Sequence, residues 1–460
     1  MGVKTENVEH KEGEVVDDLS KIQVELSPEQ DESVDEDKLA ALKAKMAAKS
    51  GTEEEKMPVR IIEKKTRSLE IGVVGSGQAG SRLAESFYKL GYDALAFNTA
   101  RQDLEHIDIP EANKCLLEYG LGGASKDPQI GKEAAETHRD YISAKINDQL
   151  GDADIFCFCT SLGGGSGGGS IETMVEVMGS IGKPVVVMTV LPMTNEDPQT
   201  KKNSLEALKK LATYVQQGVV HNLVVVDNAK IETIFKDIGP MNFYKVSNQA
   251  IVSPLDVFNT YSSMPSPGMK VMDPMEWTKI LIDGNGLSLY GEISVANYEE
   301  DTALAEAVVE NLTAGLLAEG FDLKQTKYVG AIFLANEKVW EKVPSAAINY
   351  AMTMVQDYAG TPQGVFRGIY HAEDLDEDVV KVYSFFSGLA LPDSRVEELK
   401  AEVTTHMSTL KTKEEKRNLN LNLDTGSKAK SKVDEVNERI KDKKSPFSQF
   451  KQGLINKRRK

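Results

Sequence analysis

Residues Gly163 to Gly169 read Gly-Gly-Gly-Ser-Gly-Gly-Gly, and the fold class can be inferred from this run and the segments on either side of it. It follows the apolar run Ile155–Cys159 (IFCFC) and precedes the amphipathic stretch Ile171–Glu176 (IETMVE). That order predicts a buried strand, a loop and the start of a helix. A flexible glycine–serine linker is the alternative, but such linkers do not join a buried strand to an amphipathic helix within a domain.

The chemistry of the run favours phosphate binding. Glycine admits positive φ angles and lets backbone amide groups approach a bound anion. The following helix directs its unsatisfied N–H groups and the positive end of its dipole to the same place. We therefore expect anion contacts from Gly163, Gly164, Gly165, Ser166, Gly167 and Gly168.

The composition limits the class of protein. The chain has 460 residues, 40% of them hydrophobic, which leaves room for two or three domains with cores. The formal net charge of -17 argues against nucleic-acid binding by the folded body. Cys115, Cys157 and Cys159 are too few for a disulfide framework and suit a reducing cytosol. The sequence shows no signal-peptide core and no stretch of twenty apolar residues, so we expect a cytoplasmic protein without a membrane partner.

Apolar runs alternate with helical patterns through the first half of the folded part. Candidate strands lie at 68–74, 94–98, 114–117, 155–159, 184–190 and 222–227, and helical patterns at 131–150, 171–181 and 198–217. This alternation is typical of a doubly wound α/β domain with a parallel sheet, which binds ligands at the carboxyl ends of its strands.

The chain divides into six predicted parts. Residues 1–67 are acidic and poor in aromatic residues, as in disordered segments. The folded part comprises a phosphate-binding domain at 68–238, a long central helix at 239–262, a second, smaller α/β domain at 263–392 and an exposed helix at 393–418. Residues 419–460 form a tail with too few apolar residues for a core, and we expect it to be disordered. Its last twenty residues carry eight Lys or Arg against one acid, Asp442.

Two further glycine-rich segments follow predicted strands. Gly75-x-Gly77-x-x-Gly80 matches a dinucleotide fingerprint, but Asn98 stands where that interpretation needs an acid for the ribose. An NAD-dependent enzyme would also have no use for the run at Gly163. The second segment is residues 120–124 (GLGGA). No Gly-x-x-x-x-Gly-Lys-Ser/Thr motif occurs, so the sequence does not support a P-loop ATPase.

Taken together, these loops resemble those of the tubulin/FtsZ family of GTPases. The run at Gly163 is similar to the family's phosphate-binding glycine loop, and the resemblance continues in the same order from about residue 71 to residue 283. Residues 77–80 resemble the first nucleotide loop of tubulins, residues 97–104 the second loop of FtsZ, and residues 120–131 the third loop, which contacts the terminal phosphate. The resemblance implies a tubulin/FtsZ fold and GTP or GDP contacts from Gly77, Gln78, Ala79, Gly80, Asn98, Gly122, Gly123 and Ala124.

Later segments resemble the parts of the family that bind ribose and base. Pro192 with Glu196 is similar to the ribose loop, and Asn228 to the strand end near the base. Phe243 and Asn248 match helix positions where an aromatic ring stacks on guanine and a polar side chain binds its edge. The preference for guanine follows from the resemblance, since the residue types alone indicate only stacking and an amide.

The segment Asp273-Pro274-Met275-Glu276 has two interpretations. Asp273 can cap a helix that begins at Pro274, with Glu276 closing a capping box. The resemblance implies catalysis, because in this family a loop of one subunit supplies acids that polarise the attacking water in the GTP site of the next. Capping would orient the same pair, so both can hold.

The sequence departs from FtsZ at several positions. Val271 and Glu276 stand where FtsZ has Asn and Asp, and these variants are more like the TubZ branch of plasmid- and phage-encoded tubulins. Thr200 replaces the ribose-loop arginine, which leaves Lys201 or Lys202 as a substitute.

The resemblance implies a self-assembling GTPase with split sites. We expect head-to-tail filaments, Mg²⁺ between the phosphates, and no metal site built from protein ligands alone. The basic tail at 441–460 is either inert or a tether for a DNA-bound adaptor or for DNA itself. The tether interpretation favours a role in plasmid or phage DNA segregation. A division-ring protein of the FtsZ kind and a non-hydrolysing scaffold remain as alternatives.

Overall fold

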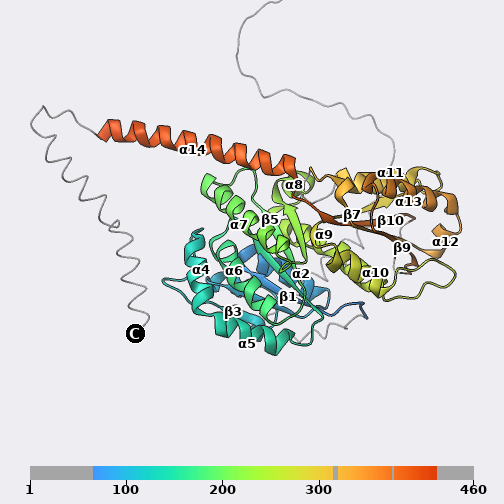
Figure 1. Cartoon of the computed structure of the whole chain (residues 1–460), viewed down its shortest axis with the longest axis horizontal. Coiled ribbons are helices and arrows are strands. Elements are labelled where there is room, and N and C mark those ends of the chain that lie inside the picture. The colour runs from blue at the N-terminus through green and yellow to red at the C-terminus, as the bar shows by residue number, and fades with distance from the viewer. Residues whose placement is uncertain (1–65, 314–319, 374, 376–377, 422–460) are drawn as a thin grey trace, which may run out of the picture. The chain divides into compact units, whose positions relative to one another are not determined.

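The computed structural model describes residues 66–313, 320–373, 375 and 378–421. Within these residues, ten strands form one continuous sheet in the order β3-β2-β1-β4-β5-β6-β7-β10-β8-β9 (Figure 1). The predicted segments 1–67 and 419–460 lie almost entirely outside the described residues, and the basic tail at 441–460 lies wholly outside them. Arg67 was predicted to belong to the N-terminal extension, but it lies within the described residues and its side chain is buried.

The first half of the sheet confirms the predicted alternation. All its strand pairs are parallel, and the strands are buried, as expected for a sheet covered by helices. The strands are β1 (Ile71–Ser76), β2 (Ala94–Asn98), β3 (Lys114–Leu116), β4 (Ile155–Ser161), β5 (Val185–Leu191) and β6 (Asn222–Asp227). Cys157 and Cys159 of β4 pack in the core with their sulfur atoms 3.9 Å apart.

Helices connect these strands. They are α2 (Gly77–Lys89), α3 (Arg101–Glu105), α4 (Pro128–Thr137), α5 (Arg139–Leu150), α6 (Gly165–Ser180), α7 (Pro198–Gln216) and α8 (Asn228–Ile234), with a short 3-10 turn at Glu111–Asn113. The helical pattern at 131–150 is thus two helices, because His138 between them leaves the helical conformation at ψ 17°. α4, α6 and α7 lie side by side (Figure 1).

The predicted central helix is α9 (Pro240–Tyr261). It leads to α10 (Pro274–Thr278), a π-helical turn (Lys279–Asp283) and the second half of the sheet. That half contains β7 (Gly286–Val295), β8 (Tyr328–Ala335), β9 (Gly364–His371) and β10 (Val380–Leu389), with α11 (Ala303–Thr313), a 3-10 turn (Leu323–Gln325), α12 (Glu337–Trp340) and α13 (Ser345–Ala359). β10 pairs antiparallel with β7 and β8, whereas β7 continues the parallel half through Asn222↔Gly286. The two halves therefore share one sheet.

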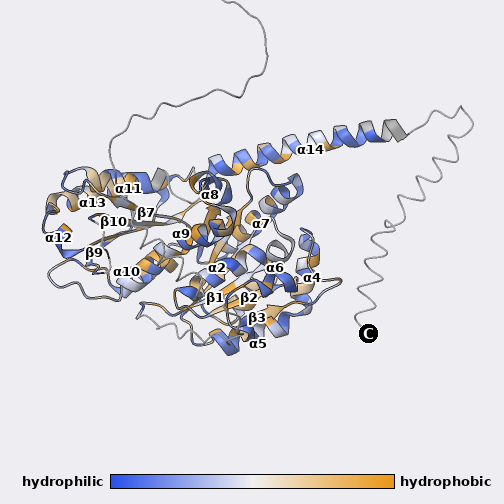
Figure 2. Ribbon diagram, turned by 180° about the vertical axis from the view of Figure 1, so that it is seen from behind, coloured by the Kyte–Doolittle hydropathy of each residue, from blue (hydrophilic) through white to orange (hydrophobic). Residues whose placement is uncertain are grey.

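The last helix, α14 (Asp393–Leu421), is only partly the exposed helix that was predicted. Its colouring is mostly hydrophilic, in contrast to the apolar strands β1 and β2 (Figure 2). Its first turns are nevertheless anchored, because Leu399 is buried and Arg395 Nε donates to Asp227 Oδ2 at 2.7 Å. Across the described part of the chain, no helix has both the length and the apolar character needed to cross a bilayer.

Candidate functional site

A cleft of about 370 Å³ opens where the strands of the parallel half end. Its wall comes from the segments after β1 to β6 and from α9. The chain leaves β1 toward β2 and β3 and returns as β4 on the other side of β1, so the cleft lies at the topological switch point where such sheets bind ligands. The predicted residues on the wall are Gly77, Gln78, Ala79, Gly123, Ala124, Gly163, Gly164, Gly165, Ser166, Gly167, Glu196, Asn228 and Asn248.

Two helices begin on this wall. The first amide groups of α2 and α6 have no acceptor within their helix, so both N-termini offer hydrogen bonds and positive dipole ends to an anion. Gly77 has a φ of 73°, and a Cβ there would lie 2.7 Å from the backbone nitrogen of Gly167. Glycine at position 77 therefore permits the two N-termini to touch.

The glycine run is mostly helix, whereas a seven-residue loop was predicted. α6 begins at Gly165 rather than near Ile171, and the run contributes none of the positive φ angles among the described residues. The glycines permit close packing instead. A Cβ at Gly169 would lie 2.2 Å from the carbonyl oxygen of Pro128, and a Cβ at Gly131 would lie 2.0 Å from that of Gly165. α4 and α6 thus pack backbone against backbone, which fixes where α6 starts.

The loop between β3 and α4 forms the third side of the cleft. Gly123 N donates to Thr99 O at 2.8 Å, and the hydroxyl oxygens of Thr99 and Ser166 lie 2.6 Å apart. The loop, the end of β2 and the start of α6 are therefore one connected wall. Ser125 and Lys126 have φ angles of 45° and 59°, in the left-handed region that non-glycine residues seldom occupy.

The predicted ribose segment contacts this loop. Glu196 Oε1 accepts a hydrogen bond from Met193 N at 3.2 Å, and Asp197 caps α7 by accepting from Thr200 N at 2.9 Å. Asp197 also accepts from Lys126 Nζ at 2.7 Å. Burial disfavours the ionised carboxylate, but the hydrogen bonds from Lys126 and Thr200 outweigh it and lower the pKa of Asp197 to about 2. The same hydrogen bond raises the pKa of Lys126.

At the far side of the cleft, Tyr244 takes the place predicted for Phe243. Tyr244, Asn248 and Ile251 line the cleft at helical spacings of four and three. Phe243 lies 100° away around α9, where it packs against the core. The predicted aromatic residue was therefore wrong by one position along α9, which turns the side chain to another face of the helix.

Other predicted residues lie outside the wall. Asn98 is buried, and its amide fixes two residues of the wall by accepting from Ala100 N and donating to Asp103 Oδ2, both at 3.1 Å. A Cβ at Gly80 would lie 2.2 Å from the carbonyl oxygen of Cys159, so this glycine lets α2 pack on β4. Gly122 and Gly168 are also absent from the wall.

Neither lysine proposed as a ribose-loop substitute reaches the cleft. Lys201 is buried and donates to Thr194 O at 2.6 Å, while it pairs with Glu402 of α14 at 2.8 Å. Lys202 faces Glu206. The basic residues on the wall are Arg82, whose guanidinium lies 4.4 Å from the ring centre of Tyr244, and Lys126. The sequence analysis did not identify these two residues. Both lie in or beside the glycine-rich segments, but spacing in the sequence does not show whether their side chains point into the cleft.

The acidic pair Asp273 and Glu276 forms the predicted capping box at the start of α10. Glu276 N donates to Asp273 Oδ1 at 2.8 Å, and Asp273 N donates to Glu276 Oε2 at 3.0 Å. The hydroxyl of Tyr370 holds the preceding residue, accepting from Met272 N at 2.9 Å. Burial, together with the charges of Glu276 and Asp273, raises the pKa of Tyr370 to about 12. Asp273 itself is exposed.

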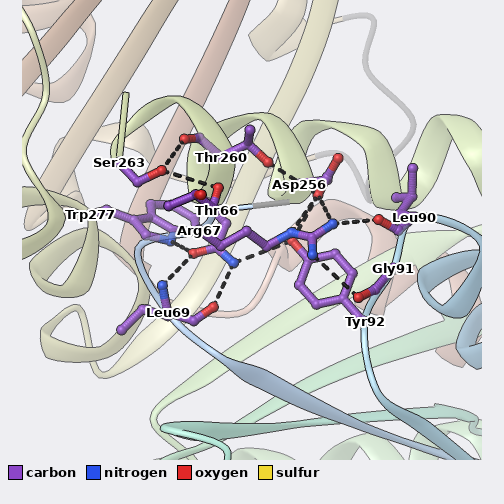
Figure 3. Close-up of polar contacts among 11 residues, drawn as sticks. Thr66, Arg67, Leu69, Leu90, Gly91, Tyr92, Asp256, Thr260, Ser263 and Trp277 are labelled. Carbon is purple, nitrogen blue, oxygen red and sulfur yellow. Dashed lines mark hydrogen bonds and ion pairs between the residues drawn. The ribbon is translucent and has the colours of Figure 1, made fainter. Parts of the chain in front are cut away.

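A buried polar network fixes this turn to the end of α9 and the start of β1 (Figure 3). Asn259 Oδ1 accepts from Leu69 N at 3.0 Å and from Trp277 Nε1 at 3.1 Å. Nearby, Arg67 pairs with Asp256 at 3.0 Å, and both side chains are almost fully buried. Removing one partner of such a pair would leave a buried charge.

The acidic pair and the cleft lie at opposite ends of α9 and of β1. The cleft receives Tyr244, Asn248 and Ile251 of α9 and the residues that directly follow β1. The acidic pair is bound through Trp277 to the last turns of α9 and to the start of β1. α9 has 22 residues and so spans about 33 Å. Asp273 and Glu276 therefore cannot reach the cleft of their own subunit.

Comparisons with known proteins show what the chain is similar to. Residues 70–236 match the family model described as "Tubulin/FtsZ family, GTPase domain". The tubulin-like protein CetZ of Pyrococcus abyssi is 26% identical over 326 residues, covering 69% of this chain and 85% of the relative. The tubulin-like protein TubZ of Bacillus cereus is 25% identical over 365 residues, covering 73% and 83%.

A solved structure shares the fold. The GTPγS-form protofilament of TubZ from Bacillus thuringiensis serovar israelensis aligns with a TM-score of 0.68 at 19% identity, covering 76% of this chain and 95% of that one. At that identity the likeness concerns the fold alone. Residues 70–236 are thus a tubulin/FtsZ GTPase domain, and the chain as a whole is similar in sequence to CetZ and TubZ and in fold to TubZ.

Proposed function

We propose that the chain binds GTP in the cleft and hydrolyses it when subunits assemble head to tail. Asp273 and Glu276 of one subunit complete the cleft of the next. The observation that carries this proposal is the separation of the two parts, because the cleft has phosphate-binding backbone and the acidic pair stands at the other end of α9. Neither part is complete without a second copy.

Exposed apolar side chains at both ends support such a contact. Met241 is 97% exposed beside the cleft, and Leu121 is 69% exposed on the loop before Gly123. At the other end, Met275 is 66% exposed between the two acids. Apolar side chains exposed on two different faces fit a heterologous interface, which generates filaments.

The residues of the wall support the following assignment of the parts of the nucleotide. The N-termini of α2 and α6 bind the phosphates, Glu196 faces the ribose, Tyr244 stacks on the base, and the amides of Asn228 and Asn248 bind its edge. The described residues contain no cluster of three or more His, Cys, Asp or Glu that could hold a metal ion. Mg²⁺ would therefore be held chiefly by phosphate oxygens, with Asp103 as a nearby carboxylate, and it would neutralise charge on them.

The acids act on water. In the contact between subunits, the carboxylate of Asp273 accepts a proton from a water molecule, and the oxygen of that water attacks the terminal phosphorus. The bond between that phosphorus and the bridging oxygen breaks, and GDP keeps the bridging oxygen. Glu276 orients the water, and the capping box holds both carboxylates in place.

The test is the dependence of turnover on concentration. Phosphate release per subunit should rise with protein concentration until assembly saturates, because each active site needs two subunits. A rate per subunit that stays constant from dilute to assembled protein would contradict a shared site. No phosphate release under any condition would favour the non-hydrolysing scaffold.

We also propose a cytoplasmic role in segregating plasmid or phage DNA. Its support is the similarity to TubZ and the basic tail at 441–460, where Phe447 and Phe450 stand among the charges. Such a segment fits a peptide contact with a DNA-bound adaptor better than attraction to phosphate alone. Deleting 441–460 should spare GTP turnover and abolish co-sedimentation of filaments with adaptor-bound DNA. Undiminished co-sedimentation would leave the FtsZ-like division role as the better candidate.

A further inference from the structure

The first turns of α14 contact two segments that adjoin the wall of the cleft. Arg395 reaches the end of β6, and Glu402 reaches Lys201 of α7. Leu399, between them on the helix, is buried in the core. Among the described residues of α14, none lines the cleft itself. Any effect of this helix on the cleft must therefore pass through the residues that it contacts.

The contact with β6 fixes the orientation of Asn228. Asn228 lies on the cleft wall and directly follows Asp227, the last residue of β6. Asp227 Oδ1 accepts from Ala229 N at 3.1 Å, so this side chain closes a turn around Asn228. Arg395 holds the same carboxylate, because its Nε donates to Oδ2 at 2.7 Å and its Nη2 donates to Oδ1 at 3.4 Å. A planar guanidinium that bonds both oxygens fixes the carboxylate, and with it the turn.

This ion pair is almost fully buried. The side chain of Arg395 is 7% exposed and that of Asp227 is 3% exposed. Separating a buried pair is costly, because each charge would be left without its partner and without water. The geometry of the turn around Asn228 is therefore firmly maintained as long as α14 stays in place.

A second contact supports the ribose segment. Lys201 is buried, and its ammonium group donates to Thr194 O at 2.6 Å. Thr194 lies between Met193 and Glu196, which both line the cleft. Glu402 Oε2 lies 2.8 Å from the same ammonium group and supplies the negative charge that a buried lysine needs. The backbone of the ribose segment is thus connected to α14 through one lysine.

Glu402 also connects the two contacts. Its Oε1 lies 4.0 Å from Arg395 Nη1, while its Oε2 faces Lys201. Arg395 and Glu402 are seven residues apart, so both lie on the same face of the helix. Alternating charges therefore run along this face from Asp227 to Lys201. The described side chains from Ser408 on are exposed, so the anchoring contacts belong to the first turns alone.

We propose that α14 holds the base and ribose sides of the cleft in the geometry that binds the nucleotide. Arg395 is a positioning residue for Asn228, and Glu402 is a positioning residue for the ribose segment. A partner that withdrew α14 would weaken nucleotide binding without touching the cleft. This inference rests on the proposed function, since it requires the base to lie against Asn228.

Binding of GDP and of ADP to the full chain tests the role of Arg395, since both diphosphates avoid the need for a terminal phosphate. Arg395→Lys keeps the buried charge but cannot bond both oxygens of Asp227 in one plane. It should lower the preference for GDP over ADP by about fivefold or more. A general loss of structure would weaken both nucleotides alike, so an unaltered preference in Arg395→Lys would overturn the role of this residue.

Two further variants of α14 sharpen the measurement. Glu402→Gln should weaken GDP and ADP together by about two- to fivefold, because both carry the same ribose, and parental affinities would contradict its role. Lys400→Met is the matched control. It removes an exposed lysine of the same helix that pairs with Glu397, and it should leave the affinities and the preference unchanged.

Hydrogen exchange of the parent chain gives a test that needs no variant. If docking of α14 strengthens GDP binding, GDP must strengthen docking by the same factor. Saturating GDP should therefore slow amide exchange at residues 396–402 by about fivefold or more, and leave residues from 408 on unchanged. Protection of the glycine run without protection of 396–402 would overturn the inference. Failure of the proposed function differs, because the parent chain would then bind neither GDP nor GTPγS.

Discussion

The cleft at the start of α9 and the acidic turn beyond its end are built from different parts of the chain. Around the cleft, backbone atoms make the decisive contacts, and glycines allow them. Gly77 lets α2 touch α6, and Gly131 lets α4 touch α6. The acidic turn depends on side chains, with a capping box on its surface and the amide of Asn259 behind it.

Because of this difference, substitutions at the cleft and at the acidic turn should have different effects. At Gly77 and Gly131 an added Cβ would meet backbone atoms of α6, so even alanine is disruptive there. At the acidic turn, a substitution that keeps shape and hydrogen bonds can remove charge without disturbing the fold. Binding and catalysis should therefore be separable by mutation, because the cleft depends on backbone contacts and the acidic turn, at the other end of α9, depends on side chains.

The largest expected effect lies at the acidic turn. Asp273→Asn keeps an N-cap for α10 but removes the carboxylate, so GTP turnover should fall by about 100-fold or more while the melting temperature and GTPγS affinity stay near those of the parent. Phosphate release and thermal unfolding measure the two quantities. Asp322→Ala, which removes a cap at another site, should leave turnover intact. Parental turnover in Asp273→Asn would mean that Asp273 serves only as a cap.

The next effect tests the backbone character of the cleft. Gly77→Ala places a Cβ at a φ of 73° and 2.7 Å from Gly167 N, so it should cost about 2–4 kcal/mol of stability and weaken GTPγS binding by at least about tenfold. Gly182→Ala has a similar φ of 83° but open space around it. It should cost only about 1–2 kcal/mol and spare binding. Equal effects of the two substitutions in chemical denaturation would show that contact between α2 and α6 is unimportant.

A third prediction separates neighbouring aromatic residues. Tyr244→Ala should weaken GTPγS binding by about tenfold, because stacking of a base on an aromatic ring contributes about 1–3 kcal/mol. Tyr244→Phe should keep the stacking. Phe243→Ala should lower stability instead, because Phe243 packs against the core. If Phe243→Ala lost the greater part of the affinity, the phase assigned to α9 would be wrong.

Several features of the fold could be predicted from the sequence because their signals are local. The apolar runs at 155–159 and 222–227 became β4 and β6, and the pattern from 239 to 261 became α9. Most of the predicted cleft residues also lie on the wall, since loops at the carboxyl ends of adjacent parallel strands meet.

The remaining features depend on contacts between distant segments. Glycine propensity favours a loop at 165–169, yet packing against α4 imposes a helix there. Helix phase decides between Phe243 and Tyr244, and one residue of error turns a side chain by 100°. The burial of Arg67 and Arg395 follows from Asp256 and Asp227, acids more than 160 residues away in sequence.

The smallest expected effect measures how firmly the acidic turn must be held. Tyr370→Phe removes the hydroxyl that bonds both backbone groups of Met272, at 2.9 and 3.2 Å, directly before Asp273. Stability should fall by about 1–2 kcal/mol, because buried backbone groups lose a partner. Turnover should fall only about two- to fivefold, since the capping box remains, and GTPγS affinity should not change because the cleft is at the other end of α9. A loss of affinity in calorimetry would show that the two ends are coupled through the sheet, and that binding and catalysis are not separable.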